Sequence, residues 1–152
     1  MSNARLNYPK TAPEPYRLLG EIKQWLDNAE IDQRLRGLLD VRISQLNGCA
    51  FCLDIHTREA IEHGVTRQQL DVLTAWHEAP MLFSDAERAA LEWAEAMTLL
   101  PEVGAPDATF ETLREHFSEA QIVTLTWAIV AMNSWNRLAV GFGVNPRPRK
   151  DA

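Results

Sequence analysis

The sequence lacks the features of several large protein classes. It has only two cysteines in 152 residues, and 15 Lys and Arg are outnumbered by 21 Asp and Glu, which gives a formal charge of -6. Without a basic stripe to release counterions from phosphates, we expect no nucleic acid and no membrane as partner. No apolar run is long enough for a membrane span, and residues 1–20 contain no signal-like apolar segment, so we expect a cytoplasmic protein.

The sequence also lacks any stretch that alternates apolar and polar residues with the period of two typical of strands. Apolar residues recur at intervals of three and four instead, which predicts an all-α fold. There is no internal repeat, low-complexity tract or linker, and 46% hydrophobic residues suit one core. We therefore expect a single helical domain over 15–142, an extended, proline-punctuated arm over 1–14 and a tail over 143–152.

Capping signals predict where the helices begin and end. We expect helices over about 14–28, from Asp32 to Asn47-Gly48, over 49–62, from Thr66 to before Pro80, from Ser84 to Pro101, over about 107–116, and from Ser118 onward. A glutamate or glutamine three residues after Thr66, Ser84 and Ser118 matches the capping box. The last helix is long and mostly apolar, so we expect it to be the buried central helix of the bundle.

Both cysteines lie in the short run Cys49-Ala50-Phe51-Cys52, and His56 follows four residues later. In a helix these three residues stand at i, i+3 and i+7, so both sulfurs and the imidazole share one face. Helical neighbours three residues apart lie about 5–6 Å from each other, inside the Cα window of roughly 4.4–6.8 Å that a disulfide needs. The spacing therefore favours a pair that cycles between dithiol and disulfide.

Two local features favour a reactive thiolate in this run. The first turn of a helix stabilises a thiolate, and His56 stands one turn after Cys52, where it can accept the thiol proton. Cys52 would attack a peroxide oxygen, and Cys49 would condense with the resulting sulfenic acid to form the disulfide. The helix dipole alone would favour Cys49 as the attacking thiol, so the assignment of Cys52 rests on its spacing to His56.

Other interpretations of the two cysteines remain open. They could be buried thiols that pack as small hydrophobic groups. A closed zinc site needs four ligands, and only His63 and His77 lie near the run, so we expect no metal. A thioredoxin-like oxidoreductase would place C-x-x-C in a βαβ unit, and no strand is predicted.

Residues 41–56, VRISQLNGCAFCLDIH, resemble the core motif of the AhpD-like alkylhydroperoxidases in the carboxymuconolactone decarboxylase superfamily. Residues 83–91 and 133–138 resemble later segments of that family, so the likeness covers about residues 15–142. It implies an all-helical fold, homotrimers or homohexamers, and antioxidant reduction of organic hydroperoxides or hydrogen peroxide through Cys52 and Cys49, with His56 as the matching histidine. It also implies no cofactor, and a protein or small-thiol reductant that reopens the disulfide.

One position departs from the resemblance. AhpD enzymes carry a glutamate about three turns before the first cysteine, where it is the base of a proton relay through the histidine, and here that position is Gly37. Asp40 stands one turn further along the same helix face and is the candidate replacement. The alternative is that Asp40 is a solvated charge beside Arg42 and that His56 acts alone.

Polar residues next to the motif are candidates for a supporting role. Ser44, Gln45 and Asn47 precede the cysteines, and their match to the family motif suggests that they orient the turn; ordinary helix-end hydrogen bonding is the alternative. Asn133 and Asn136 interrupt the most apolar helix and need hydrogen-bond partners there.

Two other functions are compatible with the sequence. A decarboxylase acting on a lactone, like the superfamily's namesake, would need neither thiol. A non-enzymatic redox sensor would form a reversible disulfide that changes oligomer size or partner binding while consuming little peroxide. The sequence leaves open the reductant, the preferred peroxide and the choice between trimer and hexamer.

Overall fold

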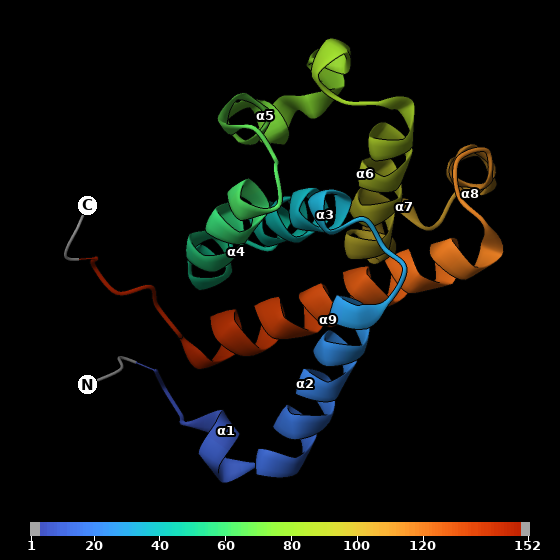
Figure 1. Cartoon of the computed structure of the whole chain (residues 1–152). Coiled ribbons are helices and arrows are strands. Elements are labelled where there is room, and N and C mark those ends of the chain that lie inside the picture. Colours follow the sequence, from blue (N-terminus) through green and yellow to red (C-terminus); the bar gives the residue numbers. More distant parts are fainter. Residues whose placement is uncertain (1–3, 150–152) are drawn as a thin grey trace.

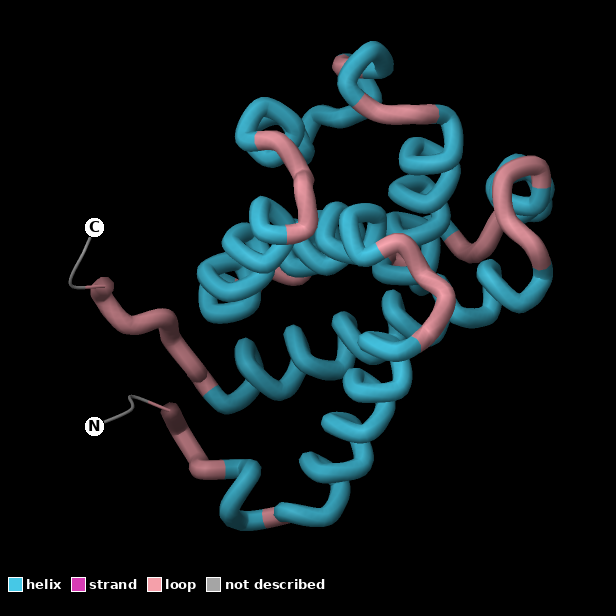
Figure 2. Tube along the Cα trace, in the orientation of Figure 1, coloured by secondary structure: helices cyan, strands magenta, loops and turns pink. Residues whose placement is uncertain are grey.

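The computed structural model describes residues 4–149, which form helices joined by short turns, with no strand in this range (Figures 1 and 2). The helices are α1 (Tyr8–Thr11), α2 (Pro13–Asn28), α3 (Gln33–Leu46), α4 (Ala50–Glu62), α5 (Arg67–Val72), the 3₁₀ turns η1 (Leu73–Glu78) and η2 (Pro80–Leu82), α6 (Asp85–Thr98), α7 (Leu100–Val103), α8 (Asp107–Arg114) and α9 (Glu119–Phe142). The prediction of a single-domain, all-α fold is confirmed.

Helix α3 is the centre of the fold. It packs against α4, α6 and α9, and Leu38, Leu39 and Ile43 on it have no exposed surface. Burial of such a side chain contributes about 1.5–3 kcal/mol. Figure 1 shows α3 and α4 side by side, with the long helix α9 crossing beneath them. The turn between α3 and α4, which carries the cysteines, is therefore held between the core and α9.

The predicted caps are present. The side chain of Asp32 accepts a hydrogen bond from the backbone N–H of Arg34 at 2.9 Å, and Thr66, Ser84 and Ser118 each form a complete capping box. Gly48 stands in the turn after α3 with φ of +62°, a conformation that glycine adopts without strain. These local interactions explain why the boundaries of the long helices could be predicted closely.

The N-terminal arm differs from the prediction, because the chain is helical from Tyr8 rather than extended. Pro9 lies in the first turn of α1 and Pro13 begins α2. A proline there fits, since its fixed φ is helical and the first N–H groups of a helix have no intrahelical partner. Residues 1–3 of the predicted arm and 150–152 of the predicted tail lie outside the described residues.

Burial of α9 and α2 is one-sided. The inner face of α9 includes the fully buried Asn136, whereas its outer face exposes Val123, Trp127 and Val130. Helix α2 packs through Leu26 against Ala128 and Ala131 of α9, and it exposes Tyr16, Leu18 and Trp25. Among residues 4–149, no helix has the length and apolar character needed to cross a membrane.

Helices α3 and α4 approach each other closely at Gly37. A Cβ atom built on Gly37 would lie 3.0 Å from both the Cα and the Cβ of Ala60 on α4. Such a contact is too short for carbon atoms, whose optimal separation is about 3.5–4.0 Å. Close packing therefore favours glycine at this position, and a larger side chain would require Ala60 on α4 to shift by a few tenths of an ångström.

We expect Gly37→Ala to lower the free energy of unfolding by about 1–3 kcal/mol, because the added methyl group must push α4 away from the core. Gly20→Ala is the matched control, since nothing lies within 4 Å of a Cβ at Gly20 in α2. The control should gain about 0.5–1 kcal/mol from helix propensity. Urea unfolding of both variants measures the difference, and equal stabilities would contradict the close packing of α3 on α4.

Candidate redox-active site

Cys49 and Cys52 form a disulfide at the start of α4, with their Cα atoms 5.3 Å apart. Cys49 is the N-cap of α4, and its sulfur accepts a hydrogen bond from the backbone N–H of Cys52 at 3.3 Å. Both residues are buried. The prediction that the C-x-x-C spacing brings the sulfurs together is confirmed, which places a dithiol–disulfide couple at the N-terminal end of a helix.

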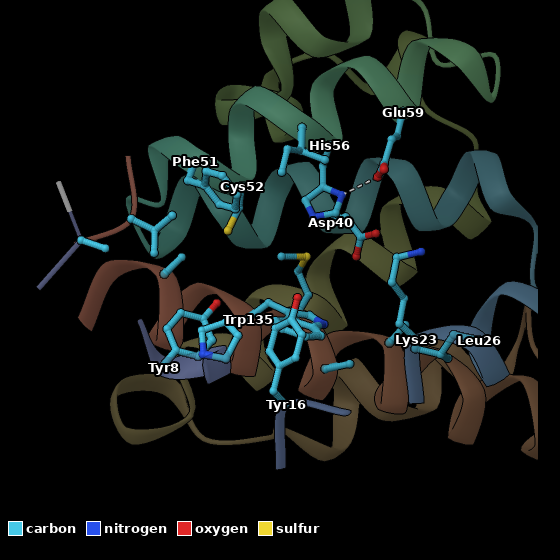
Figure 3. A pocket seen from close by; sticks show the side chains of 18 of the residues that line it. Tyr8, Tyr16, Lys23, Leu26, Asp40, Phe51, Cys52, His56, Glu59 and Trp135 are labelled. Atoms are coloured by element: carbon cyan, nitrogen blue, oxygen red, sulfur yellow. Dashed lines mark hydrogen bonds and ion pairs between the residues drawn. The ribbon is translucent and has the colours of Figure 1, made fainter. Parts of the chain in front are cut away.

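His56 lies one turn after Cys52 on the same helix, and both side chains point from α4 toward α9 (Figure 3). Its Nδ1 is 2.8 Å from Oε2 of Glu59. The His56 side chain is largely buried, whereas that of Glu59 is 45% exposed. Sequence reasoning missed Glu59, although its position three residues after His56 places it on the same helix face. The carboxylate fixes Nδ1 as the protonated nitrogen when the ring is neutral, which leaves Nε2 as an acceptor.

Asp40 reaches the same region from α3 and is buried. Burial raises the pKa of its carboxyl group, and the nearby His56 and Arg36 oppose only part of that rise. Arg36 is the ion-pair partner of Asp40, with Nε 3.6 Å from Oδ2, whereas Arg42 pairs with Glu95. The alternative of a solvated Asp40 beside Arg42 is therefore wrong, and its role as a relay base stays a prediction.

A cavity of about 480 Å³ opens onto Cys52 and His56. Its lining is mostly apolar and aromatic, with contributions from α1, α2, α4 and α9; it includes Tyr8, Tyr16, Leu26, Phe51, Ile55, Met132 and Trp135. Cys52 lines this cavity, whereas Cys49 does not. The structure therefore presents one of the two sulfurs to a bound molecule and keeps the other behind it.

A second, polar cavity of about 320 Å³ adjoins the first. Five side chains line both cavities: Lys23, Arg36, Asp40, His56 and Glu59. His56 and its carboxylate neighbours thus stand where an apolar chamber meets a charged opening. This position allows protons to pass between the buried thiols and water.

A hydrogen-bond network holds the turn that carries the cysteines. The Asn47 side chain donates to Oδ1 of Asn133 and of Asn136, both at 2.9 Å. Asn136 donates in turn to Oγ of Ser44 at 3.2 Å, and the backbone N–H of Cys49 donates to the carbonyl of Ser44 at 3.0 Å. Ser44 and Asn47 therefore anchor the turn to α9, as the family motif suggested, whereas Gln45 bonds Arg42 instead.

His63 lines the polar cavity together with His56 and Glu59, whereas His77 lines neither cavity. His63 and His77, the other possible zinc ligands, are both exposed. Across the described range, no three His, Cys, Asp or Glu side chains are grouped closely enough to share a metal ion.

Comparison with known proteins agrees with this arrangement. The family model "Carboxymuconolactone decarboxylase family" matches residues 13–96. The uncharacterized protein YdfG of Bacillus subtilis (strain 168) is 39% identical over 139 residues, which cover 91% of this chain and 94% of YdfG. The chain belongs to the carboxymuconolactone decarboxylase family.

Solved structures of other proteins share the fold of this chain. A protein of unknown function from Agrobacterium tumefaciens, suggested to be the antioxidant defence protein AhpD, superposes with a TM-score of 0.90 at 40% identity, covering 96% of this chain and all of that one. The debrominase Bmp8 superposes with a TM-score of 0.80 over 91% of this chain and 74% of its own, but at 20% identity it shows the fold alone. These likenesses confirm the resemblance to AhpD-like proteins.

The raised pKa of Asp40 gives the stability a testable pH dependence. Above its unfolded pKa of 3.8, the native state retains a proton that the unfolded chain has lost, so the contribution of Asp40 to stability falls as pH rises through the folded pKa. The contribution of Asp27 depends on pH in the opposite direction. Burial raises the pKa of Asp27, but hydrogen bonds from Lys23 and Arg36 outweigh that effect, so the pKa is lowered. Its contribution is present above 3.8 and is lost as pH falls.

We therefore expect the stability of Asp40→Asn, relative to the unmodified protein, to rise as pH rises above 3.8. Asp27→Asn, the matched control on the other side of Arg36, should change in relative stability only near and below pH 3.8, with the opposite sign, and should be independent of pH above that range. Urea unfolding at half-unit steps from pH 3.5 to 8 measures both differences. A pH-independent difference for Asp40→Asn would show that this carboxyl group titrates normally in the fold.

Proposed function

We propose that the protein is a thiol-dependent peroxidase of the AhpD type, which reduces organic hydroperoxides or hydrogen peroxide through a disulfide cycle of Cys52 and Cys49 and so serves antioxidant defence. The supporting observation is that Cys52 faces a substrate-sized cavity beside His56, while Cys49 lies at disulfide distance behind it. This arrangement supports Cys52 as the attacking thiol, because a bound peroxide meets that sulfur first.

The reaction balances with the two thiols as the electron source. Cys52 gives its proton to His56, and the thiolate attacks one peroxide oxygen, which breaks the O–O bond and forms a sulfenic acid on Cys52. The other oxygen leaves as an alkoxide and takes up a proton as the alcohol. The sulfur of Cys49 then attacks the sulfur of Cys52 and forms the disulfide. The hydroxide displaced from Cys52 takes up the proton of the Cys49 thiol and leaves as water. A protein dithiol or small thiols, available in the cytoplasm, return two electrons and reopen the disulfide.

In this proposal, Glu59 and Asp40 together take the role of the glutamate that AhpD enzymes carry at the position of Gly37. Glu59 accepts a hydrogen bond from Nδ1 of His56, which leaves Nε2 free to receive the thiol proton. Asp40 lines the same cavity, and burial raises the pKa of its carboxyl group, so it holds a proton more readily than an exposed aspartate and is the second group that can pass protons to or from the cavity. Both carboxyl groups reach the polar cavity, through which protons exchange with water.

We also propose that the protein assembles as a homotrimer or homohexamer, as its resemblance to the family implies. The supporting feature is apolar surface on two neighbouring helices. Val123, Trp127 and Val130 follow one exposed face of α9, and Leu18 and Trp25 lie seven residues apart on α2. Exposed apolar groups on adjacent helices favour contact with another protein surface.

The peroxidase proposal predicts distinct fates for the two cysteines. In stopped-flow measurements, the reduced protein should lose two thiols per peroxide, faster than free cysteine at the same pH. Cys52→Ser should react no faster than free cysteine. Cys49→Ser should lose one thiol and retain a sulfenic acid, which dimedone traps and mass spectrometry detects.

Other results would favour the other functions. Decarboxylation of a lactone that is unchanged when both cysteines are replaced by serine would favour the decarboxylase. A reversible disulfide that changes oligomer size without peroxide consumption would favour the redox sensor. Oxidation of the unmodified protein no faster than free cysteine contradicts the peroxidase.

Replacement of Glu59 tests how His56 is oriented. We expect Glu59→Gln to slow thiol oxidation by roughly tenfold or more, because a glutamine amide can donate to Nδ1 and stabilise the wrong tautomer. Glu78→Gln, the same change on an exposed residue that lines neither cavity, should leave the rate unchanged. The ¹⁵N chemical shifts of His56 report the tautomer directly, and an unchanged tautomer in Glu59→Gln would contradict this role.

A further inference from the structure

Three aromatic side chains from different helices form one wall of the cavity, on the side facing Cys52. We call Tyr8 of α1, Tyr16 of α2 and Trp135 of α9 the aromatic wall. The ring centroids of Tyr8 and Tyr16 are 5.9 Å apart and those of Tyr16 and Trp135 are 5.6 Å apart, both edge to face. In Figure 3 the hydroxyl group of Tyr16 points from this wall toward α4, which carries Cys52 and His56.

Contacts between the N-terminal segment and the end of α9 hold the aromatic wall in place. The ring of Tyr8 stacks on Phe142 at the end of α9, with centroids 5.1 Å apart. Just before it, the backbone N–H of Arg5 donates to the carbonyl of Phe142 at 2.6 Å, and its guanidinium donates to the carbonyl of Gly141. The N-terminal segment is thus tied across the end of α9, and this tie positions Tyr8 at the cavity.

The charged side chains that line the cavity do not favour an anionic substrate. Its two cationic side chains, Lys23 and Arg36, are both paired with Asp27, at 2.9 and 2.6 Å. The carboxylate of Glu59 also lines the cavity. Burial and the neighbouring Tyr16 raise the pKa of Tyr8, so its ring remains a neutral phenol. An anionic substrate would have to displace existing ion pairs, whereas a neutral aromatic one would not.

The size of the cavity also argues against hydrogen peroxide as the best-fitting substrate. Its volume of about 480 Å³ lies within the range of roughly 300–1,000 Å³ found for sites that hold organic ligands. Hydrogen peroxide would leave most of the apolar lining without contacts. An aromatic ring in the cavity could add further edge-to-face contacts to those already made by the wall.

We propose that the aromatic wall makes the site selective for neutral hydroperoxides that carry an aryl group on the peroxide-bearing carbon. The inference rests on the proposed function and names the substrate class for the same site. The aryl ring would lie against Tyr8, Tyr16 and Trp135, which directs the peroxide group to the sulfur of Cys52 on the facing helix. Tyr16 and Tyr8 are then specificity-determining residues, without a part in breaking the O–O bond.

Two hydroperoxides that differ by one group test this selectivity. Cumene hydroperoxide has a phenyl group where tert-butyl hydroperoxide has a methyl group, on the same tertiary carbon. We expect kcat/KM for the cumene compound to be roughly tenfold higher or more. Tyr16→Leu should reduce that ratio to about threefold or less, mainly by lowering kcat/KM for the cumene compound, and Tyr8→Leu should act in the same direction.

Two further variants test whether the aromatic ring of Tyr16 itself causes the selectivity. Tyr16→Phe keeps the ring and should keep the ratio. Trp25→Leu removes an exposed aromatic side chain from the same helix, outside the cavity lining, and should also keep it. Circular dichroism and melting temperatures establish that each variant is folded. A ratio near one in the unmodified protein, or a ratio unaffected by both tyrosine-to-leucine variants, would overturn the inference.

Binding of the product alcohols gives a readout that does not depend on catalysis. Isothermal titration calorimetry should show that 2-phenyl-2-propanol binds the unmodified protein at least tenfold more tightly than tert-butanol, and that Tyr16→Leu loses this difference. If neither hydroperoxide is reduced but this preference is found, the peroxidase proposal fails and the aromatic site stands. If both are reduced equally and the alcohols bind equally, the function stands and the aromatic selectivity is wrong.

Discussion

The close contact between α3 and α4 determines how the rest of the site is built. Gly37 lets the two helices approach until a single added carbon would lie 3.0 Å from Ala60. This approach brings Asp40 of α3 beside His56 of α4 in one lining. A side chain at this position, such as the glutamate that AhpD enzymes carry, would require α4 to shift by a few tenths of an ångström. The close packing that assembles the site therefore favours glycine at position 37.

Two carboxyl groups remain near His56, and their surroundings differ. Glu59 is half exposed and within hydrogen-bond distance of the ring, so water stabilises its charge and it can hold one tautomer permanently. Asp40 is buried, and desolvation favours its protonated form. Environments that separate two acids in this way are typical of sites where one group orients and the other supplies a proton.

Much of the fold could be predicted because its signals are local. The caps at Asp32, Thr66 and Ser84 depend on residues within one turn, and the C-x-x-C geometry depends only on helical spacing. Tertiary packing decided what the sequence could not show: which sides of α2 and α9 are exposed, and which carboxylate meets His56. Glu59 shares a helix face with His56, but the same face also offers other polar groups. The aromatic wall unites residues more than 100 positions apart, so no local pattern contained it.

Both cysteines are buried, but only Cys52 lines the cavity, and this difference has a consequence for redox chemistry. A sulfenic acid on Cys52 would be exposed to further peroxide in the cavity, and a second oxidation step would be irreversible by thiols. Cys49 does not line the cavity, but its sulfur accepts a hydrogen bond from the backbone N–H of Cys52 at the start of α4. It is therefore shielded from peroxide and yet adjacent to the sulfur it must attack. In the proposed mechanism, condensation within one helical turn requires little backbone movement and would outpace the second oxidation, so that the N-cap of α4 would protect the attacking thiol.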